Sequence, residues 1–299
     1  MDYEAFKQYV QEHIREFLPP ETAANEIILT TAKKDHEKRM EMLIMKTKSC
    51  QTVNVFLSHL YDFYEQGAGI DEVLRNIAGG FAKRADEIDR FFSKYLAGKF
   101  SFENLKGHIY PTVRNAEWNE EILKEVPHET RDDLVIVYQV EIRDRKGLLS
   151  FLIHDSYLKA WGICEEMLKH TAWDNLHRDY LPTVTPLTYY NLEAGQVLSR
   201  PDKIEGAVYM FDREWMKQTA ERSGTDLIVI PSSIHETILI GRKDHMDLEN
   251  IQELVEAVNT NCVRDEEVLS NSVYLFEKDT LSLSRFDPGE QAQGMNMMM

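Results

Sequence analysis

The run Gly206-Ala-Val-Tyr-Met-Phe211 opens the stretch of sequence that decides the predicted fold, residues 206–277. This apolar run predicts a short strand. Asp212 follows it as a favourable helix N-cap, and apolar residues at helical spacing continue to Gly224, where the helix is expected to end. The stretch therefore begins with a predicted strand and a predicted helix.

Two β-branched runs, Leu227–Ile230 and Thr237–Ile240, come next and predict the two strands of a hairpin. Asp247 begins a second helical pattern, and Ser272–Phe276 is predicted as a last strand. The predicted order is thus strand, helix, strand, strand, helix, strand. Such an order is typical of a complete α+β unit.

The same order of elements is predicted between residues 109 and 189. Ile109–Val113 and Leu134–Ile142 are predicted strands with a short helix between them, and Leu148–Ile153 is the return strand of a second hairpin. A helical segment and the extended run Pro182–Tyr189 complete the series. Two stretches with one element order predict an internal structural repeat of the split β-α-β type.

The N-terminal third has a different pattern of apolar residues and is predicted to be mainly helical with one β-hairpin. Asp2 precedes an apolar stripe at helical spacing. Glu26–Ala32 and Arg39–Lys46 predict two antiparallel strands around a charged loop, and helical spacing returns from Asn54. We expect this region to form its own module.

These patterns predict an α+β protein with four parts. The parts are a helical module with a hairpin at 1–105, a first α+β unit at 106–192, a second at 193–285, and a disordered tail at 286–299.

Charge and cysteine content restrict the class of protein. The chain has 34 Lys+Arg against 51 Asp+Glu, a net charge of -17, which opposes binding to nucleic acids and to anionic membranes. Its three cysteines are far apart and form no disulfide or zinc pattern. No apolar run is long enough to span a membrane, and the first residues lack a secretory signal pattern. We expect a cytoplasmic protein.

Several short motifs occur together in one order along the chain: Tyr110-Pro111…Asn115, Val126-Pro127-His128…Asp133-Leu134, Leu158-Lys-Ala-Trp161-Gly162, Ile230-Pro231-Ser232-Ser233-Ile234-His235-Glu236 and Glu267-Val268-Leu269-Ser270-Asn271-Ser272-Val273-Tyr274. The ensemble resembles a family of uncharacterised bacterial proteins, a domain of unknown function found mainly in gut anaerobes. The resemblance covers residues 25–280. Cys164 departs from the Ser or Thr that relatives usually place before two acidic residues, which weakens a helix cap. The resemblance implies no activity, cofactor or catalytic residue.

The segment Ile230–Glu236, here called the Ser/His corner, is the first candidate site. It places Ser232, Ser233, His235 and Glu236 at a predicted turn between two strands. A hydroxyl, an imidazole and a carboxylate are the groups that nucleophilic catalysis uses. Neighbours in a strand point to opposite faces, however, and serine hydroxyls often satisfy the amides of a turn. The structural interpretation is therefore favoured over the catalytic one.

A second candidate cluster combines His128 and Glu129 with the acidic pair Asp132-Asp133. A histidine with carboxylates can bind a metal or act as acid and base. No pair of ligands here lies one helical turn apart, as in HExxH, so no metal site is predicted. The acidic pair leads directly into a strand and is equally explained as a loop end.

No other motif indicates a cofactor. The sequence contains neither a phosphate-binding loop nor a strand-led GxGxxG, so we expect no nucleotide cofactor. The region Lys33–Lys48 is mildly basic, but its excess of positive charge is small, and lysines on an edge strand also discourage strand pairing.

Three functions remain open at this stage. The first is a non-catalytic binding or regulatory protein that recognises a protein or small-molecule partner. The second is a hydrolase-like enzyme that uses the Ser/His corner, with His128 as a further candidate. The third is nucleic-acid handling through the N-terminal module. A cleft lined by His128, Ser233 and His235 would favour the enzyme. The oligomeric state is left open.

Overall fold

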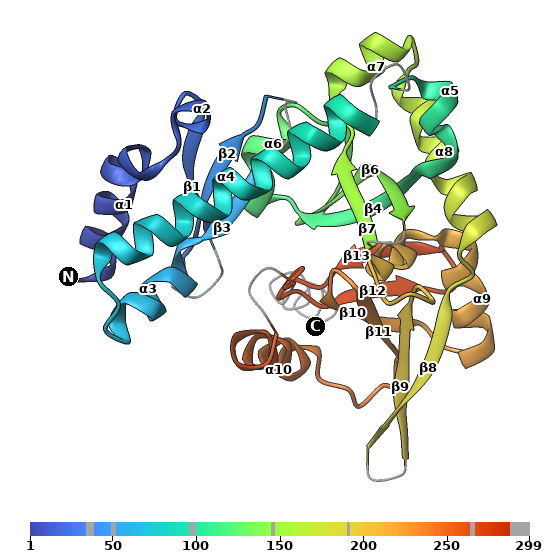
Figure 1. Cartoon of the computed structure of the whole chain (residues 1–299). Helices are drawn as coiled ribbons and strands as arrows, with labels where there is room; N and C mark the ends of the chain where they lie inside the picture. The colour runs from blue at the N-terminus through green and yellow to red at the C-terminus, as the bar shows by residue number, and fades with distance from the viewer. Residues whose placement is uncertain are drawn as a thin grey trace. The chain divides into compact units, whose positions relative to one another are not determined.

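The computed structural model describes residues 1–33, 39–48, 52–95, 100–144, 147–189, 192–263 and 267–287. It shows helices combined with antiparallel sheets, which confirms the predicted α+β class (Figure 1). The chain divides into two compact units. The first consists of Met1–Lys106, Glu117–Lys124 and Lys159–Trp161, and the second of Gly107–Ala116, Glu125–Leu158 and Gly162–Met299.

The first unit has a three-stranded antiparallel sheet with helices packed on it. Its strands are β1 (Ile27–Lys33), β2 (Arg39–Lys46) and β3 (Thr52–Phe56), with β2 in the centre. The helices of this part of the chain are α1 (Tyr3–Phe17), α2 (Pro20–Ala23), α3 (Leu57–Glu65), α4 (Ile70–Tyr95), α5 (Phe102–Leu105) and α6 (Glu120–Leu123), with the 3-10 turns η1 (Lys106–His108) and η2 (Glu117–Asn119).

Local sequence signals explain most of this unit. The Asp2 carboxylate accepts a hydrogen bond from the backbone N–H of Ala5 at 2.9 Å, which fixes the start of α1. The apolar stripe of α1 is buried in one core with residues of β2 and α4. The predicted pairing of β1 with β2 is confirmed. Thr52–Phe56 is a third strand, so the helix predicted from Asn54 begins later, at Leu57.

The second unit contains a four-stranded antiparallel sheet built around β6. Its strands are β4 (Ile109–Asn115), β5 (His128–Arg131), β6 (Leu134–Asp144) and β7 (Gly147–Leu152). β4 pairs along one edge of β6, so β5 and β7 share the other edge, one after the other. Leu134–Tyr138 is buried on both faces of the strand, as its continuous apolar run predicts. The predicted hairpin of β6 and β7 is confirmed.

Two consecutive helices follow this sheet. α7 (Asp155–Trp161) ends at Gly162, whose φ of 68° is the left-handed conformation that favours glycine. α8 (Glu165–Asp179) packs against β4, where the Asn175 side chain donates to the Ile109 carbonyl at 2.8 Å.

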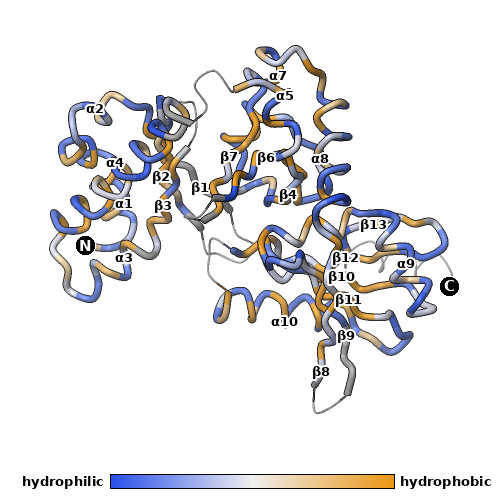
Figure 2. Tube along the Cα trace, turned by 45° about the vertical axis from the view of Figure 1, so that its right-hand side comes forward, coloured by the Kyte–Doolittle hydropathy of each residue, from blue (hydrophilic) through white to orange (hydrophobic). Residues whose placement is uncertain are grey.

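The second sheet of this unit has six antiparallel strands in the order β13-β12-β10-β11-β9-β8. They are β8 (Thr183–Tyr189), β9 (Leu192–Ser199), β10 (Leu227–Ser233), β11 (Glu236–Gly241), β12 (Tyr274–Glu277) and β13 (Ser282–Arg285). The predicted hairpin of β10 and β11 is confirmed. In Figure 2 hydrophobic residues run along β10 and β6, the central strands of the two sheets.

The helices of the last third begin where their N-caps predict. α9 (Arg213–Ser223) is capped by Asp212 and ends at Gly224, and α10 (Leu248–Asn261) is capped by Asp247. α10 packs on β10, where Leu248 and Val255 join the local core. No helix in the described part of the chain is long and apolar enough to cross a membrane.

The prediction of a strand at 206–211 is wrong. Gly206–Phe211 is the 3-10 helix η3, whose first five residues are buried. Burial on every side removes the alternation that separates a strand from a helix, so an apolar run of this length fits both.

The strand pairing does not follow the predicted repeat. β8, predicted as the last strand of the first α+β unit, pairs with β9 in the six-stranded sheet. The predicted boundary at 192/193 falls between these two paired strands. β4 pairs with β6 in the four-stranded sheet, whereas the predicted counterpart of β4, Gly206–Phe211, is not a strand.

The predicted tail needs one correction at its start. Phe286 is buried in the core near α10, and its backbone N–H donates to the Val273 carbonyl at 2.8 Å. Residues 288–299 lie outside the described part of the chain.

Candidate functional site

The Ser/His corner connects β10 to β11 and carries Ser232, Ser233, His235 and Glu236. The strand register shifts between Ile230 and Ser233, so the corner is irregular. The buried Ser233 hydroxyl accepts a hydrogen bond from the backbone N–H of His235 at 3.1 Å. Ser232 and Glu236 are partly exposed at its edge. The Ser233 side chain thus closes its own turn.

The His235 ring is held against a neighbouring loop. Its Nδ1 accepts a hydrogen bond from the backbone N–H of Glu205 at 3.2 Å, which places the proton of the neutral ring on Nε2. That Nε2 lies 3.8 Å from Glu267 Oε1. The His235 carbonyl accepts from the Ser199 hydroxyl at 2.7 Å and from the Gly206 N–H at 3.1 Å. The ring therefore faces the amide of Glu205, not the hydroxyl of Ser233.

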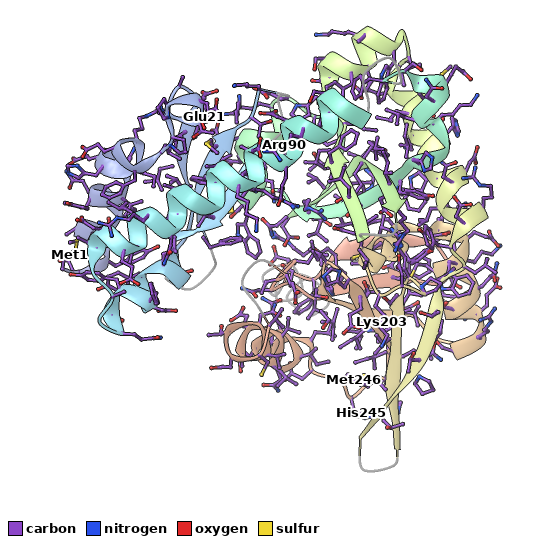
Figure 3. The ribbon with its side chains drawn as sticks, viewed as in Figure 1. Met1, Glu21, Arg90, Lys203, His245 and Met246 are labelled. Carbon is purple, nitrogen blue, oxygen red and sulfur yellow. The ribbon has the colours of Figure 1, made fainter. Side chains whose placement is uncertain are left out.

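Close packing around the loop that contains Glu205 explains why glycine is present at position 206. A Cβ at Gly206 would lie 2.5 Å from both the Arg200 nitrogen and the His235 carbonyl oxygen. Lys203, labelled in Figure 3, lies on the same loop, and Lys203 and Glu205 both have positive φ, 58° and 55°. The backbone is therefore strained beside the corner, and the surrounding contacts hold it in place.

Glu205 connects the corner loop to β4. Its carboxylate accepts two hydrogen bonds from the Arg114 guanidinium, at 2.6 and 3.0 Å, and one from the Thr112 hydroxyl. Burial raises the pKa of the Glu205 carboxyl, but the Arg114 charge and these hydrogen bonds outweigh it and keep the pKa below its usual value. The ionised pair fixes the loop on which His235 rests.

His128 belongs to a different sheet from the corner. It is an exposed residue of β5, in the four-stranded sheet, and its Nδ1 is 2.9 Å from the Val126 carbonyl oxygen. The corner belongs to the six-stranded sheet, and among the described residues no hydrogen bond or ion pair joins His128 to Ser233 or His235. The neighbouring Glu129 carboxylate instead accepts hydrogen bonds from Tyr138 at 2.5 Å and Lys169 at 2.7 Å.

The acidic pair beside His128 divides into two structural roles. The Asp133 carboxylate accepts hydrogen bonds from the hydroxyls of Ser270, at 2.6 Å, and of Tyr274. The Asp132 carboxylate accepts one from the Arg285 backbone N–H at 3.1 Å. Within the described ranges, no group of three or more His, Cys, Asp or Glu side chains could hold a metal ion.

A buried ion pair, which the sequence analysis did not identify, joins β6 to the end of β9. The Arg200 guanidinium, fully buried, donates to both carboxylate oxygens of Glu141 at 2.7 and 2.9 Å. It also donates to Asp202 at 3.0 Å and lies over the Tyr180 ring, 3.9 Å from its centroid. Polar residues at 139 and 141, inside the apolar run of β6, were the available signal.

A surface pocket of about 160 Å³ lies in the second unit, where three segments that are distant in the sequence meet. The segments are the turn before β6, the junction of η3 and α9, and the hairpin of β12 and β13. Figures 1 and 2 both show β12 and β13 beside α9. The lining residues are Arg131, Asp132, Met210, Phe211, Arg213, Tyr274, Phe276, Leu281 and Leu283.

Six apolar or aromatic residues and three charged residues line the pocket. Its described lining contains no serine, cysteine, histidine or lysine. Burial and the bond to Asp133 raise the pKa of the Tyr274 phenol, so this hydroxyl stays protonated and occupied. The lining is therefore suited to holding a ligand and offers no activated nucleophile.

Fold and pocket together describe an α+β protein with a small surface pocket that has charged groups in its lining. The chain belongs to a family of unknown function, DUF5688, whose model matches residues 3–278. This match confirms the resemblance found in the sequence, and it ends before β13, which contributes Leu283 to the pocket. No curated protein and no solved structure matches the chain.

Proposed function

We propose that this protein is a non-catalytic binding protein that holds a small molecule in the pocket between the 131–132 turn, the start of α9 and the β12–β13 hairpin. The convergence of these three segments carries the proposal. Ligand sites are typically concave and apolar with a few polar groups that fix orientation, and this lining has that composition.

The contacts of the Ser/His corner support the same proposal. A serine nucleophile needs a base within hydrogen-bond reach of its hydroxyl. Here the Ser233 hydroxyl accepts from a backbone N–H, and the His235 ring accepts from the Glu205 N–H. Both groups already stabilise the turn and the loop beside it. The hydrolase is therefore the less favoured alternative.

The cellular setting belongs to the proposal as well. Cys164 and Cys262 are exposed free thiols, which persist best in a reducing cytoplasm. The net charge of -17 opposes nucleic acid as a partner. The basic segment on which that alternative depends lies partly outside the described residues, at 34–38.

Binding at the pocket can be tested by NMR with a library of fragments, using Leu283→Trp to fill the pocket. We expect fragments to shift the resonances of α9 and of the β12–β13 hairpin, and the variant to lose this binding. Leu254→Trp is the matched control, because Leu254 is exposed on α10 and is not part of the lining.

Fragments that bind equally to the wild type and to Leu283→Trp would contradict the proposed site. Turnover of a generic ester by the wild type, abolished in Ser233→Ala, would favour the hydrolase instead.

A further inference from the structure

The charged groups of the pocket are unusual for so acidic a chain. Two guanidinium groups, of Arg131 and Arg213, and one carboxylate, of Asp132, contribute to the lining. The lining therefore has a net charge of +1, whereas the whole chain has -17. A ligand of net charge -1 matches this lining.

Arg213 is the cation most available to such a ligand. It is the first residue of α9 and is exposed, and no hydrogen bond or ion pair of its guanidinium occurs within the described ranges. A guanidinium presents donors in a planar fork that matches a carboxylate. Arg213 can therefore bind an incoming anion without breaking an existing contact.

The other two charged residues of the lining, Arg131 and Asp132, already form hydrogen bonds within the protein. Arg131 donates a hydrogen bond to Glu129 at 2.9 Å, and Lys169 donates to the same carboxylate. One carboxylate therefore faces two cations and cannot neutralise both of them. Asp132 is held by the backbone N–H of Arg285. Arg131 thus adds attraction for an anion, and the position of Asp132 is explained without a ligand.

The volume of the pocket indicates the size of the group that it can hold. The volume of about 160 Å³ is close to the roughly 150 Å³ of an engineered protein cavity that binds benzene. The lining includes three aromatic residues: Phe211, which is partly exposed, and Tyr274 and Phe276, which are almost fully buried. One ring or a short branched chain fits this space.

We infer that the ligand is a small organic carboxylate with a single-ring or short branched apolar body, whose anionic group binds Arg213 with help from Arg131. This inference rests on the proposed binding function. An apolar α-amino acid has the same carboxylate but adds an ammonium group, which would require Asp132 as its receptor.

Calorimetric or NMR titration with four ring compounds tests the inference: benzoate, neutral benzamide, cationic benzylamine and zwitterionic phenylglycine. We expect benzoate to bind at least about 10-fold more tightly than benzamide, since a charge-assisted pair with arginine is stronger than a neutral hydrogen bond. Added salt should reduce this difference.

Arg213→Gln should remove the preference for benzoate and leave benzamide binding unchanged. Arg222→Gln is the matched control, because Arg222 lies on the same helix but outside the lining, and it should keep the preference. Thermal melts would establish that both variants are folded.

Equal binding of benzoate and benzamide, or tighter binding of benzylamine, would overturn the inference and leave the binding function standing. Tighter binding of phenylglycine than of benzoate would also overturn it, in favour of an amino-acid ligand. If the fragment library and all four compounds fail to bind, the proposed function fails with the inference.

Discussion

Replacement of Glu141 by glutamine should destabilise the second unit strongly. The change removes the carboxylate charge that faces Arg200 across two hydrogen bonds of 2.7 and 2.9 Å. Because Arg200 is fully buried, its guanidinium cannot turn to water for compensation. Breaking a buried pair by removing one partner costs about 3–5 kcal/mol.

The contacts that remain to Arg200 set the expected value within that range. Asp202 still accepts a hydrogen bond at 3.0 Å, and the Tyr180 ring still lies 3.9 Å from the guanidinium carbon. We therefore expect Glu141→Gln to lower the free energy of unfolding by about 3 kcal/mol, the low end of the range.

Urea denaturation at pH 7, followed by circular dichroism, would measure this loss. Glu166→Gln is the matched control, because Glu166 forms an exposed i,i+4 pair with His170 on α8 at 3.2 Å. Exposed helical pairs contribute about 0.3–0.5 kcal/mol at most. A double variant, Arg200→Met with Glu141→Leu, should recover most of the loss. A loss of stability in Glu141→Gln no greater than in Glu166→Gln would refute the argument.

The remaining predictions concern three local contacts of the second unit and the net charge of the chain. His235→Ala removes the acceptor of the Glu205 N–H and should cost about 1–3 kcal/mol in a denaturation curve, whereas an unchanged melt with lost ester turnover would favour the hydrolase. Gly206→Ala should destabilise by about 1–3 kcal/mol or more, since its Cβ would meet backbone atoms, whereas Gly79→Ala, in the open interior of α4, should stabilise by about 0.5–1 kcal/mol. The folded-state pKa of Glu205 is lowered, so its ion pair contributes fully to stability above the unfolded pKa of about 4.3. This contribution is lost as the pH falls through the folded pKa. Glu205→Gln should therefore make the stability of the protein depend less on pH in the acid range. Gel shifts at physiological salt should show no binding to duplex DNA, and salt-sensitive binding at low micromolar protein would contradict this.

Local signals in the sequence predicted much of the secondary structure. Asp2, Asp212 and Asp247 each cap the helix that follows them, because a carboxylate beside free backbone N–H groups favours a helix start whatever the rest of the fold. The hairpins of β6 with β7 and of β10 with β11 were predicted for a similar reason, since their strands are neighbours along the chain. The α+β class followed from these elements.

Local signals could not predict contacts between residues that are far apart in the sequence. Thr112 and Glu205 are 93 residues apart, Glu141 and Arg200 are 59 apart, and Asp133 and Tyr274 are 141 apart. Nothing in the composition or spacing around these residues specifies their partners. Only the packing of the second unit places each donor beside its acceptor.

Strand order and the candidate site also depend on tertiary packing and not on local sequence. Residue patterns gave the helix starts, the hairpins and the acidic character of the chain, because these depend on neighbours and on composition. The pairing of β9 with β11, the helical form of Gly206–Phe211 and the pocket near Arg213 depend on which surfaces meet in the folded chain. Burial depends on tertiary packing. The local sequence around a buried apolar run or a buried charge therefore does not reveal which residues will contact it.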